Sequence, residues 1–101
     1  QYMPQDVLVV HNRVYLEFRE LYRKRHWYKR PSYKYLARSN NYMLEYKVED
    51  IFQDVPGDDK KVIMTIPEEI MEKQGWTQGT KIKVKWGDQG TIIIEEMKDN
   101  E

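Results

Sequence analysis

One segment of the chain alternates aromatic and basic side chains, the residue types that contact nucleic acids. Between residues 22 and 38 its aromatic residues are Tyr22, Trp27, Tyr28, Tyr33 and Tyr35, and its basic residues are Arg23, Lys24, Arg25, Lys29, Arg30, Lys34 and Arg38. Cations neutralise phosphates and release counterions, whereas aromatic rings stack on unpaired bases. We therefore predict nucleic-acid contacts at these seven cations, with stacking by Trp27, Tyr28 and Tyr33. The alternative is a solvated basic helix whose aromatic residues pack against the rest of the domain.

The charges of the chain divide between its two parts, although the net charge of its 101 residues is zero. Residues 1–41 hold nine Lys or Arg and three Asp or Glu, a charge of +6. Residues 42–101 hold eight Lys or Arg and fourteen Asp or Glu, a charge of −6. Such a basic part predicts a surface for nucleic acid or for an acidic partner. Mutual attraction of the two parts is the alternative.

The chain lacks the residues and motifs that several classes of chemistry require. The chain has no cysteine, which removes disulfides, thiolate catalysis and cysteine-based zinc sites. His11 and His26 have no metal-ligand spacing, and no nucleophile elbow, phosphate loop or dinucleotide fingerprint occurs. We therefore expect neither an enzyme nor a cofactor or metal site. No apolar run approaches the ~18 residues of a membrane span, so we expect no contact with membranes.

The elements that must position the basic segment are short. Residues 7–10 predict a strand, and Asn12 is a candidate N-cap for a helix that Pro31 ends at or before Arg30. The apolar residues at helical spacing in this stretch are Val14, Phe18, Leu21 and Tyr22. A hairpin is the alternative, because residues 14, 16 and 18 also alternate at strand period. Residues 32–38 predict another short helix, so we expect residues 1–41 to form a basic, helical N-terminal extension.

The rest of the chain, residues 42–101, predicts strands around one small helix. We expect a strand over 42–52, a turn over 53–60 and a strand over 61–66. Pro67 suits the first turn of a helix, Lys73 its last turn, and Gly75 its left-handed end. Strands over 81–86 and 91–96, joined by a turn over 87–90, complete the chain. Lys81, Lys83 and Lys85 share one strand face, which we interpret as a solvated face that protects a sheet edge.

The order of these features resembles the swapped-hairpin domain of the AbrB, MazE and SpoVT type. The residues that carry the resemblance, which covers about residues 42–97, are Ile66-Pro67, Gly75, Gly79, Lys83-Val84, Asp88 to Gly90, and Ile92 to Glu95. It implies a mainly β fold with short helices, in which hairpins from two chains interleave into one small barrel. It also implies a homodimer in the cytoplasm of a bacterial or phage-infected cell.

The same resemblance implies a DNA surface at Lys47 and at the loop over 53–61, with Lys60 and Lys61. That loop departs from the family pattern because it is acidic, and an acidic loop repels a duplex; the acids at or beside it are Asp50, Asp54, Asp58 and Asp59. Three alternatives follow. Lys60 and Lys61 suffice to bind DNA, the basic segment makes the phosphate contacts instead, or the domain serves only to dimerise.

Three functions follow from these observations. The first is a dimeric, AbrB-like, DNA-binding transcriptional regulator whose phosphate contacts come mainly from residues 1–41. The second is a protein-interaction factor, either antitoxin-like or docking on an acidic protein partner, which uses the swapped-hairpin domain only to dimerise. The third is a protein whose residues 1–41 bind RNA or single strands by stacking.

Overall fold

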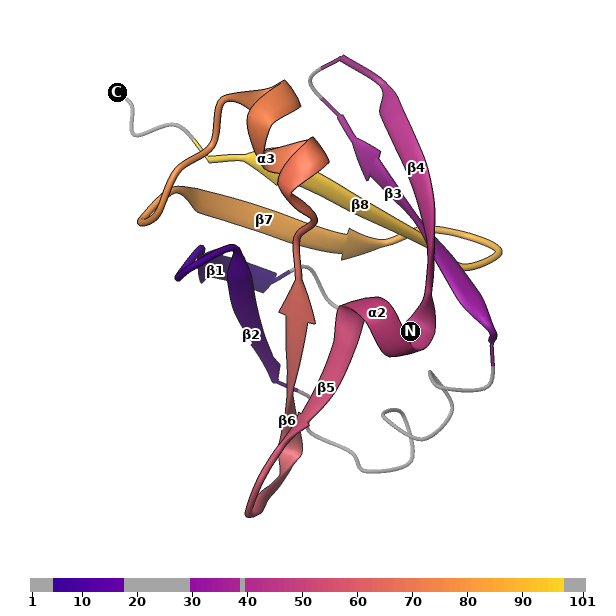
Figure 1. The fold of residues 1–101 in the computed structure, drawn as a ribbon, viewed down its shortest axis with the longest axis vertical. Helices are drawn as coiled ribbons and strands as arrows, with labels where there is room; N and C mark the ends of the chain where they lie inside the picture. Colours follow the sequence, from indigo (N-terminus) through magenta and orange to yellow (C-terminus); the bar gives the residue numbers. More distant parts are fainter. Residues whose placement is uncertain (1–4, 18–29, 39, 98–101) are drawn as a thin grey trace.

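Strands dominate the computed structural model, which describes residues 5–17, 30–38 and 40–97 (Figure 1). The strands are β1 (Gln5–Leu8), β2 (Arg13–Glu17), β3 (Ser32–Ala37), β4 (Tyr42–Lys47), β5 (Phe52–Val55), β6 (Asp58–Thr65), β7 (Lys81–Trp86) and β8 (Thr91–Glu96). Two short helices, α2 (Val48–Ile51) and α3 (Glu68–Gln74), follow β4 and β6. The expected mainly β fold with short helices is therefore confirmed.

The strands form two sheets. A five-strand sheet has the order β1-β7-β8-β3-β4, and a three-strand sheet has the order β2-β6-β5. Neighbouring strands are antiparallel except β3 and β8, which run parallel. Neither sheet closes into a barrel in the described part of the chain. The β7–β8 hairpin instead pairs on both sides with strands of its own chain, β1 and β3.

The core lies between the two sheets and is complete within one chain. Ile82 and Val84 of β7, like Ile92 and Ile94 of β8, are 0% exposed. Strands from residues 5–37 supply much of their cover, with Val9, Val14, Leu16 and Tyr35 fully buried in the same cluster. Alternate residues of these strands face the core because side chains of a strand point to opposite faces in turn. A second chain is therefore not needed to bury the apolar face of the β7–β8 hairpin.

The expected helix after Asn12 is wrong where the structure describes it, because residues 13–17 form β2. His11 and Asn12 have φ of 53° and 58° and make a two-residue hairpin turn between Val10 and Arg13, whose backbones exchange hydrogen bonds of 2.8 and 3.0 Å. Asn tolerates this left-handed conformation, which matches the twist of paired strands. The alternative hairpin interpretation holds up to Glu17, and residues 18–29 lie outside the described part.

The structure also differs from three further expectations. Residues 32–37 form β3 rather than a helix, with Tyr33, Tyr35 and Ala37 buried on one face. The strand expected over 42–52 ends at Lys47, and α2 begins at Val48. The turn expected over 53–60 narrows to residues 56 and 57, because β5 and β6 extend into it.

The helix around Pro67 is confirmed. Pro67 precedes the first residue of α3 and accepts hydrogen bonds from the amides of Ile70 and Met71 at 3.0 and 3.1 Å. Gly75 ends the helix with φ of 72°, a left-handed conformation that glycine adopts most readily because it has no Cβ. The amide of Trp76 then donates to the carbonyl of Met71 at 2.9 Å, so the buried Trp76 folds back on the helix.

Gln5 joins the two sheets where β1 and β2 diverge. Its side-chain amide donates to the carbonyl of Glu17 at 3.1 Å, and its carbonyl oxygen accepts from the amide of Glu17 at 2.9 Å. Beyond the β1–β2 turn the two strands belong to different sheets, so they cannot form a continuous ladder. Gln5 replaces two ladder hydrogen bonds across this gap.

We expect Gln5→Ala to lower the free energy of unfolding by about 1 to 2 kcal/mol, because two hydrogen bonds between the sheets are lost. Chemical denaturation of the full chain measures this change. Gln53→Ala, at an exposed position of β5, is the matched control and should change the stability by less than about 0.5 kcal/mol. Equal effects of the two substitutions would contradict the assigned role of Gln5.

Candidate nucleic-acid interface

The outer face of the five-strand sheet gathers cations from three strands and the residue after one of them. Residues that alternate with the buried ones point to this face, and Arg38 continues the alternation one residue beyond β3. We call the following six residues the basic face: Lys34, Arg38, Lys47, Lys81, Lys83 and Lys85. Lys83 and Lys85 are half-buried, and the other four are exposed.

Acidic residues on the same outer face compensate half of this charge. Asp6 of β1 and Glu95 of β8 lie opposite Lys83 on its two sides, and Glu45 of β4 lies opposite Lys34. Glu95 also forms an ion pair of 3.6 Å with Lys85. Six cations against these three acids leave an excess of positive charge, which favours an anionic partner.

The three lysines of β7 do not protect a sheet edge, so that part of the interpretation is wrong. β7 lies between β1 and β8 and is hydrogen-bonded on both sides. Charged side chains protect a strand only where its backbone groups are unpaired. The lysines therefore contribute charge to the centre of a broad face.

An apolar row crosses the basic face. In the sheet register Lys85 lies opposite Ile93, Ile93 beside Leu36, and Leu36 opposite Met43. Met43 is 48% exposed, and Ile93 and Leu36 are half-buried. The face therefore offers three adjacent aliphatic side chains with cations at their borders.

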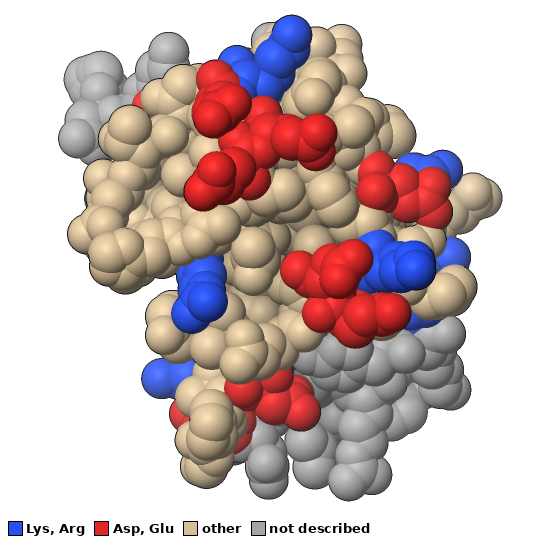
Figure 2. Space-filling model, viewed as in Figure 1, with Lys and Arg blue, Asp and Glu red and all other residues tan. Residues whose placement is uncertain are grey.

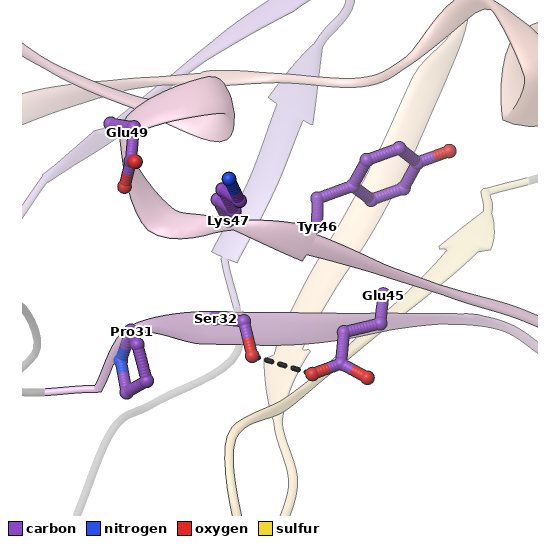
Figure 3. Close-up of a pocket in the computed structure, with 6 residues that line it drawn as sticks. All are labelled: Pro31, Ser32, Glu45, Tyr46, Lys47 and Glu49. Atoms are coloured by element: carbon purple, nitrogen blue, oxygen red, sulfur yellow. Dashed lines mark hydrogen bonds between the residues drawn. The ribbon is translucent and has the colours of Figure 1, made fainter.

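Arg30 lies at one end of the basic face. Its side chain runs over the β7–β8 turn, where a Cβ added to Gly90 would stand 2.9 Å from the Arg30 Cδ. An open depression of about 600 Å³ lies at the ends of β3 and β4 and is lined by Pro31, Ser32, Glu45, Tyr46, Lys47 and Glu49 (Figure 3). Ser32 donates a hydrogen bond to Glu45 there. Two carboxylates beside one lysine make this depression a poor phosphate site.

The structure brings together only part of the predicted interface. Lys34, Arg38 and Lys47 lie on the basic face, and Arg30 lies at its end. Residues 81, 83 and 85 were absent from the prediction, although their strict alternation with apolar residues marks them as one face. Six predicted contacts lie outside the described residues: Arg23, Lys24, Arg25, Trp27, Tyr28 and Lys29.

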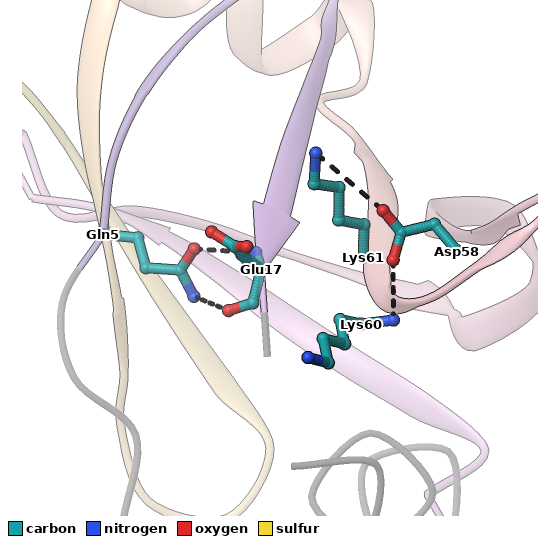
Figure 4. Close-up of polar contacts among 5 residues, drawn as sticks. All are labelled: Gln5, Glu17, Asp58, Lys60 and Lys61. Atoms are coloured by element: carbon teal, nitrogen blue, oxygen red, sulfur yellow. Dashed lines mark hydrogen bonds and ion pairs between the residues drawn. The ribbon is translucent and has the colours of Figure 1, made fainter. Parts of the chain in front are cut away.

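Lys60 and Lys61 lie elsewhere, on β6 of the three-strand sheet. Figure 4 shows Asp58 between them: it accepts from the amide of Lys60 at 3.0 Å and lies 3.9 Å from the Nζ of Lys61. The same view shows the contact of Gln5 with Glu17. Asp58 therefore offsets part of the positive charge of the two lysines that the resemblance predicts to contact DNA.

Tyr33 is not available as a stacking platform. Only 5% of it is exposed, and its ring packs edge-to-face against Phe52 with centroids 5.4 Å apart. Tyr33 and Lys34 are neighbours in the chain and therefore point to opposite faces of β3. The prediction of base stacking by Tyr33 is wrong for this reason.

Acidic side chains gather over α3, as Figure 2 shows. Glu68 and Glu69 lie in the first turn of the helix, where the positive end of the helix dipole favours them, and Glu72 follows. The Tyr46 hydroxyl donates to the Oε1 of Glu69 at 2.8 Å. This side of the molecule is unsuited to a polyanion.

Two tyrosines keep their protons far above neutral pH. Burial raises the pKa of Tyr35 well above its usual value, with nearby Tyr46 as a further cause, and its hydroxyl donates to the carbonyl of Thr65 at 2.6 Å. Desolvation raises the pKa of Tyr46 as well, followed by its hydrogen bond to Glu69. Both phenols therefore act as hydrogen-bond donors rather than as bases.

Comparison with known proteins returns no relative: no family model, curated protein or solved structure matches the chain. The described residues contain no helix that is both long and apolar enough to cross a membrane. They also contain no group of three or more His, Asp or Glu placed to hold a metal ion.

The raised pKa of Tyr35 predicts an alkaline limit to stability. The pKa of Tyr35 is higher in the folded protein than in the unfolded protein, where it is about 10. The resulting stabilisation is complete at pH values below about 10 and is lost as the pH rises above that value. We expect Tyr35→Phe to lower the free energy of unfolding at neutral pH by about 1 to 3 kcal/mol, because the carbonyl of Thr65 loses its donor. The variant should also lose stability less steeply in alkaline solution.

Denaturation of the wild type and the variant at neutral and alkaline pH measures both effects. Tyr15→Phe, which removes a hydroxyl from a half-exposed tyrosine, is the control for the loss of one oxygen atom. A Tyr35→Phe variant as stable as the wild type at neutral pH would contradict the assigned hydrogen bond.

Proposed function

We propose that the chain is a nucleic-acid-binding protein that contacts the phosphates of duplex DNA with its basic face. The observation that carries the proposal is the convergence of six cations, from parts of the chain that are distant in sequence, on one face of the five-strand sheet. The predicted contacts Lys34, Arg38 and Lys47 belong to this face, and the basic segment over 22–38 leads directly into it. Its excess of positive charge supports an anionic ligand.

The shape of the face supports contact with the DNA backbone rather than with base edges. Five strands at their usual spacing of about 4.8 Å span about 19 Å, which is wider than the major groove of about 12 Å. Lysines on a broad sheet meet phosphates, and phosphate contacts position a protein without specifying a sequence. Binding of this kind depends steeply on salt, because each neutralised phosphate releases counterions.

The resemblance to AbrB-type domains adds two further parts to the proposal, dimerisation and regulation of transcription. A dimer would double the number of phosphate contacts, because each chain would contribute one basic face. Sedimentation or light scattering of the full chain tests the dimer. A mass equal to one chain at micromolar concentration would remove it from the proposal.

The apolar row favours a second candidate, an acidic protein partner. Ile93, Leu36 and Met43 offer aliphatic surface that a DNA backbone does not use, and the surrounding cations suit acidic side chains. Interfaces between proteins combine such an apolar centre with a charged rim. Met43→Gln separates the two candidates, because it should leave DNA binding unchanged but weaken the binding of a protein partner.

We expect the double variant Lys34→Gln/Arg38→Gln to weaken binding to duplex DNA and to reduce the slope of log affinity against log salt by about 1 to 2, because two phosphate contacts are lost. Fluorescence anisotropy with a labelled duplex over a range of salt concentrations measures both quantities.

The control for this experiment is Lys60→Gln/Lys73→Gln, which removes the same charge from β6 and α3. The control should lose little affinity, since neither residue lies on the basic face. Equal losses in the two double variants would show that net charge, and not the basic face, determines binding. The absence of duplex binding by the wild type at micromolar protein and low salt would refute the proposed function.

A further inference from the structure

The outer face of the three-strand sheet carries an aromatic ring that the core does not use. Tyr15 of β2 is 52% exposed, whereas its neighbours Val14 and Leu16 are fully buried on the other face of the strand. Tyr15 lies opposite Ile63 of β6, and Gln53 of β5 lies opposite Ile63 on the other side. We call Tyr15, Ile63 and Gln53 the tyrosine row.

Two cations border the tyrosine row on the same face. Arg13 precedes Tyr15 by two residues on β2, and Lys61 precedes Ile63 by two residues on β6. Side chains two residues apart on a strand project from points about 7 Å apart, within reach of one nucleotide. Glu17 lies opposite Lys61 on this face, and Asp58 approaches Lys61 to 3.9 Å.

We propose that the tyrosine row binds an unpaired base of a single-stranded nucleic acid. The base stacks on the ring of Tyr15, because an exposed aromatic ring beside cations is the common feature of sequence-tolerant single-strand sites. Arg13 meets the adjoining phosphate. Gln53, about 10 Å from Tyr15 across two strand spacings, presents an amide that both donates to and accepts from a base edge.

This inference rests on the proposed function for its ligand, but it uses a different surface. The basic face belongs to the five-strand sheet and meets phosphates only, whereas the tyrosine row belongs to the three-strand sheet and needs an exposed base. Inside a duplex both faces of a paired base are covered by the neighbouring base pairs, so none is free for Tyr15. Loss of Tyr15 should therefore affect single strands alone.

The competing explanation is a structural one. Tyr15 covers Ile63, which is only 8% exposed, and cross-strand pairs of an aromatic and a β-branched residue stabilise sheets. Leucine at position 15 would keep much of that apolar cover without an aromatic face. Phenylalanine would keep the aromatic face without the hydroxyl. These two substitutions separate stacking from cover.

The test uses a short single-stranded DNA that contains 2-aminopurine, whose fluorescence changes when it stacks, and a duplex of the same length. We expect Tyr15→Leu to weaken binding of the single strand about tenfold and to abolish the fluorescence change, since stacking on one residue has this magnitude. Tyr15→Phe should behave as the wild type in both respects. The affinity of Tyr15→Leu for the duplex should stay within about twofold of the wild type, because phosphate contacts are unchanged.

A second variant, Arg13→Gln, tests the site without altering the cover of Ile63. It should weaken binding of the single strand and leave the fluorescence change of the bound base intact. Wild-type affinity of Tyr15→Leu for the single strand, or equal losses on single strand and duplex, would overturn the inference while leaving the proposed function in place. The absence of any binding to either DNA by the wild type would overturn both.

Discussion

The parallel pairing of β3 with β8 is the constraint on which the rest of the structure depends. It sets Tyr35 beside Ile92 and Ala37 beside Ile94 on the core side, and Leu36 beside Ile93 on the outer side. A shift of one residue would expose the tyrosines and bury Lys34, because side chains alternate between the faces. The same register therefore buries the apolar face of β8 against β3 and places the cations of β3 and β7 on one face of the sheet.

Local signals predicted part of this fold from the sequence. Pro67, Gly75 and the apolar face between them define α3, and the alternation of Lys and apolar residues defines β7, because each signal lies within the element that it predicts. The identity of β2 and β3 depends instead on partners far away in the sequence. Val14 and Leu16 need β6 opposite them, and no spacing within residues 12–38 reveals that strand. For short apolar runs the helical and strand periods are hard to distinguish.

The same distinction explains how much of the candidate interface could be predicted. Residue types identified Lys34 and Arg38 as cations in a basic segment, and the family resemblance pointed to Lys47. Only the sheet register places these three on the same face as Lys81, Lys83 and Lys85. Tyr33 had the right chemistry for stacking and lies on the wrong face. Tyr15 lies outside the segment where basic and aromatic residues interleave, so composition does not indicate it as a stacking residue. The basic face does not follow the division of charge along the chain, because four of its six cations, Lys47, Lys81, Lys83 and Lys85, come from residues 42–101.

The proposed contact between the outer face of the five-strand sheet and a polyanion can be located directly. Backbone amide chemical shifts, followed by NMR while duplex DNA is added at low salt, test it most directly because they locate the contact residue by residue. The largest changes should fall on β3, β7 and β8, at Lys34, Lys83 and their neighbours, and α3 should be unaffected. Changes centred on α3 or on the β5–β6 turn, with β3 and β7 unaffected, would contradict it.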